Sequence, residues 1–222
     1  MSNPFDDPEI AGRYENWYQG PGRRADKLEK RLLSELLDML ATNRTALDVG
    51  CGTGHFSRWL ARKGLEVTGL DSAPAMIGQA RQLNGLTYRT GDAMNLPFDD
   101  ATFDLVTIVT ALEFVNDPHR ATSEAIRVAR HGVLLGVLNR HSLLYIKRRF
   151  TGGAIWKTAH FFTPRELRAL LNDAAGDRIA RIHWKTTLLP LPLIGASSVP
   201  WGGFIGMSIG LQQDPSKDTS DA

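Results

Sequence analysis

Between Thr45 and Leu138, short apolar runs alternate with helical segments, and only a few folds accommodate such an alternation. The run Phe103–Val109 is the most apolar, which is typical of a central strand covered on both faces. Repeated strand–helix–strand units form right-handed crossovers on a parallel sheet. The sequence therefore predicts an α/β fold with a doubly wound, mostly parallel sheet and helices on both faces.

The alternation weakens after Asn139, and the last part of the chain follows a different pattern. Thr163-Pro164 predicts the start of a helix that runs to about Asn172. Ile179–Thr187 and Phe204–Leu211 predict the last two of seven strands. Because no helix is predicted between these two strands, we expect an antiparallel hairpin at the C-terminal edge of the sheet.

Composition and charge narrow the classes of protein to consider. The formal net charge of +2 gives no electrostatic argument for a nucleic-acid partner. The single cysteine, Cys51, cannot form an intramolecular disulfide, and we expect a cytoplasmic location. Neither a secretory signal nor an integral membrane segment is evident. No group of potential ligands has metal-site spacing, so we expect no metal, and the oligomeric state is left open.

The segment Leu47–Gly54 carries the strongest chemical signal in the chain. It reads LDVGCGTG, a buried strand that runs into alternate glycines and then directly into a helix. Glycines allow a sharp turn and a close approach of the backbone to a ligand, and the helix N-terminus offers free N–H groups. A ligand site is therefore predicted at this turn.

The spacing of the glycines separates two kinds of nucleotide cofactor. The dinucleotide fingerprint is G-x-G-x-x-G, whereas the third glycine here is Gly54, one residue early, with His55 after it. Asp48 also places a carboxylate at the strand end, where it can meet a positively charged group such as a free α-amino group. A nicotinamide cofactor has no such group, so an NAD-dependent oxidoreductase is the less favoured reading.

Three further strand ends carry residues suited to a nucleoside, at the edge where α/β proteins bind ligands. Asp71 ends the second run and can accept both hydroxyls of a ribose. Asp92 follows the third run and can accept from an exocyclic amine such as that of adenine. Thr110 and Ala111 follow the fourth run directly.

Together these motifs resemble the class I S-adenosylmethionine (SAM)-dependent methyltransferases, specifically the type 11 group that includes ubiquinone/menaquinone- and biotin-pathway enzymes. The resemblance covers residues 14–138 and is carried by LDVGCGTG (47–54), VTGLDSAPAMIGQAR (67–81), GDAMNLPF (91–98) and FDLVTIVTALEFVNDP (103–118). It implies a Rossmann-like methyltransferase fold and an enzyme that uses SAM and releases S-adenosylhomocysteine.

The resemblance also implies which residues bind the cofactor. It places the methionine end at Asp48 and the glycine turn, the ribose at Asp71, the adenine near Met76 and Asp92, and the sulfonium near Thr110. Aromatic residues of an N-terminal cap would close over the site, because ring faces attract cations. The predicted cofactor-binding residues are Tyr14, Trp17, Asp48, Gly50, Cys51, Gly52, Gly54, Asp71, Ser72, Met76, Asp92, Ala93, Met94, Thr110 and Ala111.

The same resemblance divides the chain into parts. We predict an N-terminal cap segment and helix over residues 1–40 and a SAM-binding domain over 41–212, with a variable substrate-region insertion at about 139–162 and a disordered tail over 213–222. Residues 1–12 are expected to be a loose lead-in, before a helix from Tyr14 to Leu40. Ser72 is expected to be the N-cap of a later helix.

Methyl transfer from SAM is an in-line displacement for which the protein supplies placement and electrostatics. A general base is needed only for a protonated, weakly acidic acceptor, so no catalytic residue is assigned, and Tyr14, Glu113 and His160 are candidates. Many relatives carry a His pair where Glu113-Phe114 stands, which leaves any acid–base role at this position open.

The acceptor is expected to be a small molecule. Apolar and aromatic residues in 141–162 and 188–205 favour a hydrophobic one, unless these segments prove to be packed core. The basic run Lys147–Arg149 is expected to be a solvated face. A non-catalytic SAM-binding sensor or scaffold is the alternative function.

Overall fold

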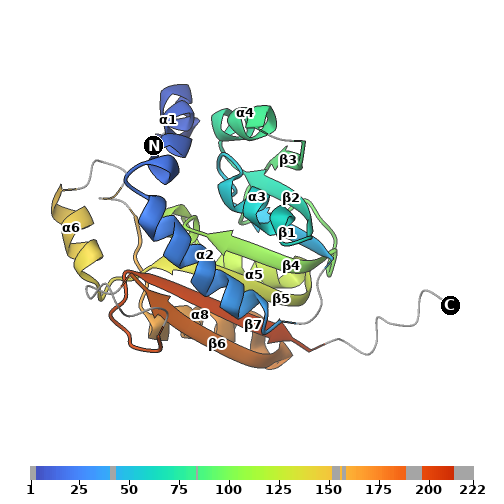
Figure 1. The fold of residues 1–222 in the computed structure, drawn as a ribbon. Helices are drawn as coiled ribbons and strands as arrows, with labels where there is room; N and C mark the ends of the chain where they lie inside the picture. The colour runs from blue at the N-terminus through green and yellow to red at the C-terminus, as the bar shows by residue number, and fades with distance from the viewer. Residues whose placement is uncertain are drawn as a thin grey trace.

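The computed structural model describes residues 4–40, 44–83, 85–151, 156, 159–188 and 197–212. Its strands are β1 (Thr45–Val49), β2 (Glu66–Asp71), β3 (Thr87–Thr90), β4 (Phe103–Val109), β5 (Ala129–Leu138), β6 (Ile179–Thr187) and β7 (Phe204–Leu211). Its α-helices are α1 (Pro8–Gln19), α2 (Arg23–Leu37), α3 (His55–Arg62), α4 (Pro74–Leu83), α5 (Pro118–Val128), α6 (Leu143–Thr151) and α8 (Pro164–Ala175). Short 3₁₀ helices are η1 (Pro4–Asp6), η2 (Leu112–Phe114) and η3 (Gly176–Arg178) (Figure 1).

The seven strands form one sheet in the order β3-β2-β1-β4-β5-β7-β6. Strands β1 to β5 pair in parallel, whereas β7 is antiparallel to both β5 and β6. The predicted doubly wound, mostly parallel sheet with an antiparallel C-terminal hairpin is therefore confirmed. Strand β7 lies between β5 and the edge strand β6 and is antiparallel to both, so within this sheet it alone runs opposite to the other strands.

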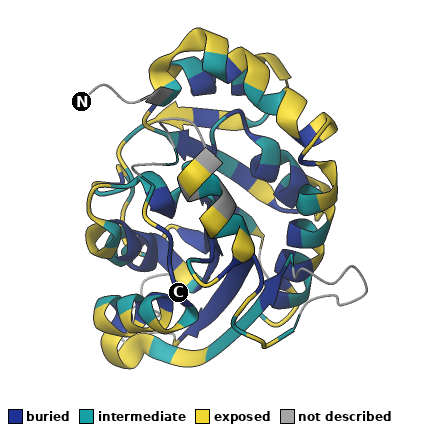
Figure 2. Ribbon diagram, turned by 90° about the vertical axis from the view of Figure 1, so that its left-hand side faces the viewer, coloured by how far each residue is buried: buried dark blue, intermediate teal, exposed yellow. Residues whose placement is uncertain are grey.

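Each face of the sheet is covered by its own set of helices, and the alternation along β5 shows how. Val133, Leu135 and Val137 pack in the core cluster that contains α5 and α8. Leu134 and Leu138 point to the opposite face, into the cluster that contains α2 and α3. Since successive side chains of a strand point to opposite faces, a strand buried on both sides reads as a continuous apolar run. Figure 2 shows the sheet buried between helices whose outer faces are exposed.

The N-terminal region differs from the prediction. The lead-in is ordered as η1 and α1, and the expected helix over Tyr14–Leu40 is interrupted between α1 and α2. The start signal is Asp7, whose side chain accepts from the N–H of Glu9, followed by Pro8 in the first turn. The interruption lies at Gly20-Pro21-Gly22, because proline has no N–H to continue the helical hydrogen bonds.

Two predicted features lie partly or wholly outside the described residues. The predicted tail over 213–222 is not among them, and neither are residues 189–196 of the connection between β6 and β7. The predicted insertion at 139–162, which contains α6, is described except at residues 152–155 and 157–158.

Helix α2 lies directly on β7 because Gly206 has no side chain. A Cβ at Gly206 would lie 2.1 Å from Leu32 Cδ2 and 2.7 Å from Leu36 Cδ1, and both leucines are fully buried. By contrast, a Cβ at Gly78, in α4, would meet nothing within 4 Å.

The substitution of alanine for glycine should therefore have opposite effects at these two positions. We expect Gly206→Ala to lower the free energy of unfolding by about 1–3 kcal/mol, because overpacking forces α2 away from the sheet. We expect Gly78→Ala to raise it by about 0.5–1 kcal/mol, because glycine is unfavourable inside a helix. Urea denaturation of both variants measures this, and equal effects would contradict the packing of α2 on β7.

Candidate functional site

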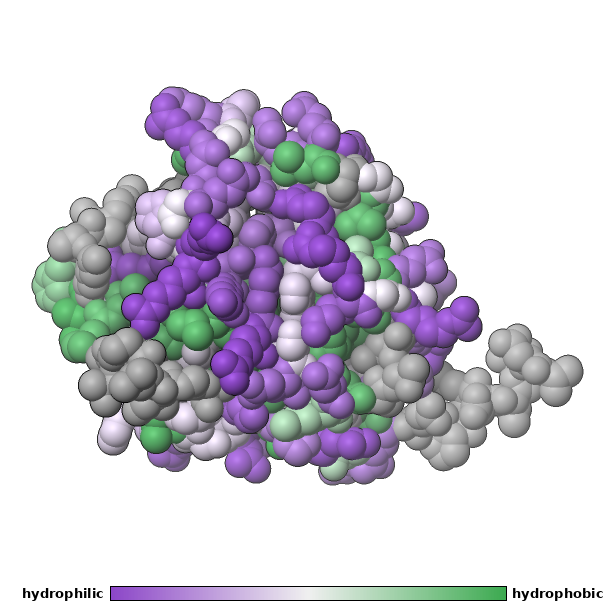
Figure 3. Space-filling view, viewed as in Figure 1, coloured by the Kyte–Doolittle hydropathy of each residue, from purple (hydrophilic) through white to green (hydrophobic). Residues whose placement is uncertain are grey.

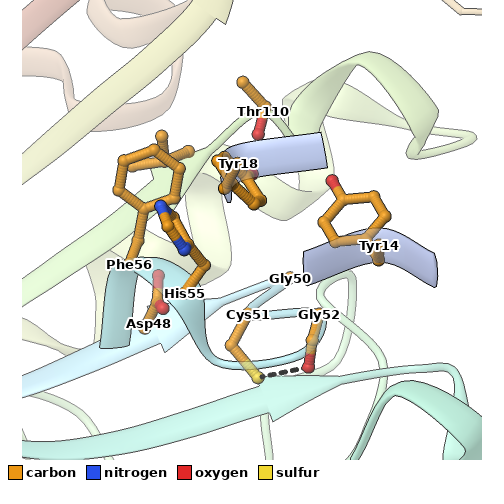
Figure 4. A pocket seen from close by; sticks show the side chains of 10 residues that line it. Tyr14, Tyr18, Asp48, Gly50, Cys51, Gly52, His55, Phe56 and Thr110 are labelled. Carbon is orange, nitrogen blue, oxygen red and sulfur yellow. Dashed lines mark hydrogen bonds between the residues drawn. The ribbon is translucent and has the colours of Figure 1, made fainter. Parts of the chain in front are cut away.

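A small cavity lies at the carboxyl ends of β1 and β4, beneath α1. Its lining comes from four parts of the chain: Asp48 on β1, the turn from Gly50 to Gly52, His55 and Phe56 at the start of α3, Val109 and Thr110 at the end of β4, and Tyr14 and Tyr18 on α1 (Figure 4). The volume of about 20 Å³ is close to that of a single water site. A ligand of nucleoside size therefore requires α1 to move away from the turn.

The glycine turn has the backbone conformation that its sequence predicts. Gly50, Gly52 and Gly54 have φ angles of +70°, +54° and +79°, a region that L-residues with a Cβ rarely adopt. A Cβ at Gly50 would also lie 2.3 Å from Ala111 Cβ. The N–H groups of Gly50 and Cys51 both donate to the carbonyl of Leu70, at 2.7 and 3.0 Å. The turn is thus fixed to β2 and leaves room above Gly52.

Asp48 is a buried carboxylate with two hydroxyl donors. Ser57 Oγ on α3 donates to Oδ2 at 2.6 Å, and Thr107 Oγ1 on β4 donates to Oδ1 at 3.0 Å. Burial nevertheless raises the pKa of Asp48 to about 6. No cation is bonded to it among the described residues, so a positively charged ligand group in the cavity would stabilise its ionised form.

Asp71 joins the end of β2 to the glycine turn. Its Oδ2 accepts from the N–H of Gly52 and its Oδ1 from the N–H of Ala73, both at 2.8 Å. Burial raises its pKa, while these backbone donors lower it. Helix α4 begins at Pro74, so the expected N-cap role of Ser72 is wrong, and Asp71 accepts from the backbone at this helix entry instead. Each oxygen of Asp71 keeps a lone pair for a ligand hydroxyl.

Thr110 adds a strained residue to the site. It has a φ of +50°, which is an outlier for a β-branched residue, and its N–H donates to the carbonyl of Gly136 at 2.7 Å. Such a conformation persists only where the surrounding structure imposes it. Residues in such conformations are concentrated at ligand sites and active sites.

The cavity brings together six of the predicted cofactor residues, namely Tyr14, Asp48, Gly50, Cys51, Gly52 and Thr110. The others lie around it and do not line it. Ala111 packs against Gly50, Gly54 against Tyr88, and Trp17 against Gly22. The remaining positions are Asp71 and Ser72 at the end of β2, Met76 on α4, and Asp92, Ala93 and Met94 after β3.

The predicted adenine residues fall into two groups. Met76 is buried with Ala11 of α1, so it is covered by the N-terminal segment. Asp92 is exposed and accepts from the N–H of Met94 at 2.8 Å, two residues beyond Thr90, which pairs with Asp71. Both groups lie at the carboxyl edge of the sheet, and their contact with adenine stays a prediction.

Three aromatic residues of the cavity, Tyr18, His55 and Phe56, were absent from the predicted set. Tyr18 stacks on His55 with ring centroids 3.5 Å apart and an interplanar angle of 10°. His55 Nε2 lies 2.7 Å from Asp26 Oδ1 of α2, which holds the imidazole against α1. The spacing of Tyr18, four residues after Tyr14, could have revealed it, since residues i and i+4 share a helix face.

Glu15 attaches α1 to the start of α3. Its Oε1 accepts from Thr53 Oγ1 and from Arg58 Nη2, each at 2.6 Å. The side chains of His55, Thr53 and Arg58 lower the pKa of Glu15 to about 2, against the effect of burial. The cap helix is therefore held over the turn by a paired, ionised carboxylate.

The candidates for acid–base chemistry differ in position. Glu113 is buried in η2, its Oε1 accepts from the N–H of Leu138 at 2.6 Å, and burial raises its pKa to about 7. Burial also raises the pKa of Tyr14. His160 is exposed, and its backbone N–H donates to the carbonyl of Glu113. Burial raises the pKa of the Cys51 thiol well above its ordinary value, as expected of a small loop residue rather than a nucleophile.

Over the described residues, no group of three or more His, Cys, Asp and Glu side chains is placed to hold a metal ion. None of the helices there is long and apolar enough to span a bilayer.

Comparison with known proteins identifies the domain. Residues 47–137 match the type 11 methyltransferase domain family. A malonyl-[acyl-carrier protein] O-methyltransferase of Erwinia billingiae is 39% identical over 120 residues, covering 51% of this chain and 48% of that protein. A demethylmenaquinone methyltransferase of Thermotoga maritima is 36% identical over 129 residues, covering 57% and 55%. The chain thus matches only about half the length of these relatives.

A solved structure covers more of the chain. It is a SAM-dependent methyltransferase of Thermotoga maritima, described as a possible histamine N-methyltransferase, with 26% identity, a TM-score of 0.77 and coverage of 91% of this chain and 96% of that one. The fold is that of a class I SAM-dependent methyltransferase. The family match over residues 47–137 and the shared fold agree with the predicted resemblance to the type 11 SAM-dependent methyltransferases.

The raised pKa of Asp48 makes the stability of the protein depend on pH. Its pKa is about 6 in the folded state against an ordinary value of 3.8, so the folded state binds this proton more tightly. Stability contributed by protonated Asp48 is therefore present in acid and lost as the pH rises between these two values. A difference of this size corresponds to about 3 kcal/mol at most.

We expect Asp48→Asn to match the wild type in stability below the ordinary aspartate pKa and to exceed it by about 1–3 kcal/mol at neutral pH. Asp104→Asn is the matched control. Asp104 accepts from the N–H groups of Arg44 and Thr45, which hold its pKa below the ordinary value, so this variant should lose stability at neutral pH. Denaturation curves across the acid range test both, and a pH-independent effect of Asp48→Asn would contradict the buried charge.

Proposed function

We propose that the protein transfers a methyl group from SAM to a small-molecule acceptor at the carboxyl ends of β1, β2 and β4. The observation that carries the proposal is the pair of carboxylates, Asp48 and Asp71, at adjacent strand ends, joined through the glycine turn by the bond from Gly52 to Asp71. A ligand with a cationic amino group at one end and vicinal hydroxyls at the other matches this pair.

The residues present fit SAM. Asp48 would hold the ammonium of its methionine end, since burial without a counter-ion favours a cationic partner. Asp71 would accept from the ribose hydroxyls while it keeps its bonds to the backbone. NAD has no free α-amino group that the buried carboxylate of Asp48 could bind. The spacing of Gly50, Gly52 and Gly54 also argues against an NAD-dependent enzyme.

SAM supplies a methyl carbon already activated by a positively charged sulfur. The chain then has to admit the ligand, orient it and exclude water. Helix α1 is the element that would move, because Tyr14 and Tyr18 fill the space above the turn. Its attachments, Glu15 to Arg58 and Tyr18 to His55, are polar or stacked contacts that can reform over a bound ligand.

The acceptor has to be inferred from the structure, since the names of the relatives differ. They include an O-methyltransferase of malonyl-[acyl-carrier protein], a demethylmenaquinone methyltransferase and a possible histamine N-methyltransferase. The predicted hydrophobic acceptor gains limited support. Tyr145, Trp156 and Phe161 pack against the core, whereas Leu143 and Phe150 of α6 are exposed. Figure 3 shows an apolar patch on the left of the molecule, the side on which Figure 1 places α6.

A non-catalytic SAM sensor is the second candidate. The seating of α1 over the turn favours it, because ligand entry would have to displace this helix and could so signal occupancy. Product formation separates the two functions.

Calorimetry with S-adenosylhomocysteine tests the cofactor site. We expect binding by the wild type, no binding of NADH, and affinity lowered about 10- to 100-fold in Asp48→Asn and in Asp71→Asn, because each removes a charge-assisted hydrogen bond. Glu35→Gln is the control, since Glu35 lies on α2 and pairs with Lys185, away from the turn.

Incubation with labelled SAM and a metabolite panel then tests turnover. Labelled product supports methyl transfer, binding without product across the panel supports the sensor, and indifference to S-adenosylhomocysteine would overturn the proposed site.

A further inference from the structure

Next to the cofactor cavity, aromatic rings and two buried acids form a second cluster, which we call the aromatic–acidic enclosure. It consists of Glu29 on α2, Glu113 on η2, Arg148 on α6, and the rings of Phe5, Tyr14, Phe114 and Trp156. Tyr14 belongs to both sites, since it lines the cavity and its hydroxyl is under the charge of Asp71, Glu113 and Glu29.

The rings of the enclosure are in sequential contact. Phe5 meets Tyr14 edge-on with centroids 6.4 Å apart and meets Phe114 at 5.1 Å. Phe114 lies 5.8 Å from Trp156. These rings come from η1, α1, η2 and the segment after α6, so the fold assembles them from distant parts of the chain.

The two acids of the enclosure are almost inaccessible to solvent. Glu113 is 1% exposed, and its Oε2 is one of two buried polar side-chain atoms without a hydrogen-bond partner among the described residues. Glu29 is 4% exposed. An unsatisfied buried carboxylate oxygen is costly, and it marks a position where a ligand donor can bind.

Arg148 supplies the cation of the enclosure. Its guanidinium carbon lies 3.7 Å from the centroid of Trp156, and it acts electrostatically on Glu29, Glu113, Tyr14 and Tyr18. One guanidinium faces two carboxyl groups, so the enclosure has an excess of acid. The expected solvated face at Lys147–Arg149 is therefore wrong for Arg148, which is half-buried and lies near these groups.

This arrangement determines which ligand charge is tolerated. Aromatic faces attract cations, and a second cation besides Arg148 would stabilise the carboxylate that Arg148 leaves uncompensated. An anionic acceptor would instead add a further carboxylate beside Glu29 and Glu113, where burial already raises the pKa of Glu29 to about 8 and of Glu113 to about 7. Arg148 itself shows that the enclosure accommodates a nitrogen cation over an aromatic face.

We propose that the enclosure binds an amine as the methyl acceptor and that Glu113 Oε2 takes the proton from its ammonium group. The inference rests on the proposed function, because it uses SAM as the methyl donor. Loss of the proton to Glu113 frees the nitrogen lone pair. The nitrogen then forms the new N–C bond while the methyl–sulfur bond breaks, and the sulfur keeps that electron pair as S-adenosylhomocysteine leaves. Glu113 returns the proton to solvent.

Arg148 competes with the amine for the same acids and the same ring. Removal of its charge should therefore strengthen amine binding, whereas an anionic acceptor would depend on Arg148 and be lost. The two classes of acceptor thus respond to one substitution in opposite directions.

The experiment measures binding to protein saturated with S-adenosylhomocysteine by calorimetry. The probes are phenethylamine, phenethyl alcohol and phenylacetate, which share a ring and differ in charge. We expect phenethylamine to bind at least about tenfold more tightly than the other two, since only its ammonium group brings a positive charge to the buried carboxyl groups and the ring faces. Arg148→Met should tighten its binding, and Glu113→Gln should weaken it about tenfold or more.

Matched controls and a pH series make the result specific. Arg130→Met removes a guanidinium that is bonded to Asp104, and Glu35→Gln removes a carboxylate that is bonded to Lys185. Both positions lie away from the enclosure, so both variants should leave amine binding unchanged. Amine binding to the wild type should strengthen as Glu113, whose pKa is about 7, ionises near neutral pH, and this rise should be absent in Glu113→Gln. The charged and titratable groups that face Glu113 are Arg148, Glu29 and Tyr14, and the hydroxyl of Tyr14 stays protonated in this range because burial raises its pKa.

Preference for phenylacetate with its loss in Arg148→Met, or no amine binding to the saturated protein, would overturn the amine inference alone. Failure of S-adenosylhomocysteine itself to bind would overturn the proposed function, and the two failures are distinct.

Discussion

The buried carboxylate of Asp48 is the constraint around which the cofactor half of the molecule is built. It ties β1 to α3 through Ser57 and to β4 through Thr107, at the centre of the sheet. A charge at this depth is tolerated only with such donors. Ser57 can reach Asp48 only if the chain turns from β1 into α3 within a few residues. Only glycines with positive φ make that turn, so the motif and the buried acid require each other.

Acids at the two ends of the sheet show how site and scaffold differ. Asp104, at the start of β4, has backbone donors and Arg130, and its pKa is lowered. Asp48 and Glu113, at the carboxyl edge, have no bonded cation among the described residues, and burial raises the pKa of each. The scaffold satisfies its own charges, whereas the carboxyl edge holds groups that are costly until a ligand arrives, as is typical of functional sites.

Much of the fold follows from local pattern. The bounds of β6 and β7 agree with the prediction residue for residue, because apolar alternation and turn residues act locally. The glycine turn could also be predicted from the sequence, because positive φ angles favour glycine over residues with a Cβ. The break before α2 and the start of α1 at Pro8 were missed, since weak apolar periodicity concealed the signals at Asp7 and Pro21.

The enclosure could not be predicted from the sequence, for a physical reason. Glu29 lies among charged residues of an amphipathic helix, and Arg148 lies in a basic run, so both read as solvated. Their burial depends on how α1, α2 and α6 meet above the sheet, which no local pattern encodes. Acidic residues are mostly exposed in proteins, so a buried acid can be recognised only once the surrounding structure is known.

Under the proposed function, this division would allow one cofactor site to serve different acceptors. The family match covers residues 47–137, which contain the glycine turn and its acids. Of the three charged groups in the enclosure, Glu113 lies within that range, whereas Glu29 and Arg148 lie outside it, on elements that precede and follow the matched domain. Under the proposed function, the flanking helices could therefore change the charge and shape presented to an acceptor while the strand ends keep the geometry that SAM would require. Glu113 would connect the two sites, because it belongs to the enclosure and lies within the matched domain.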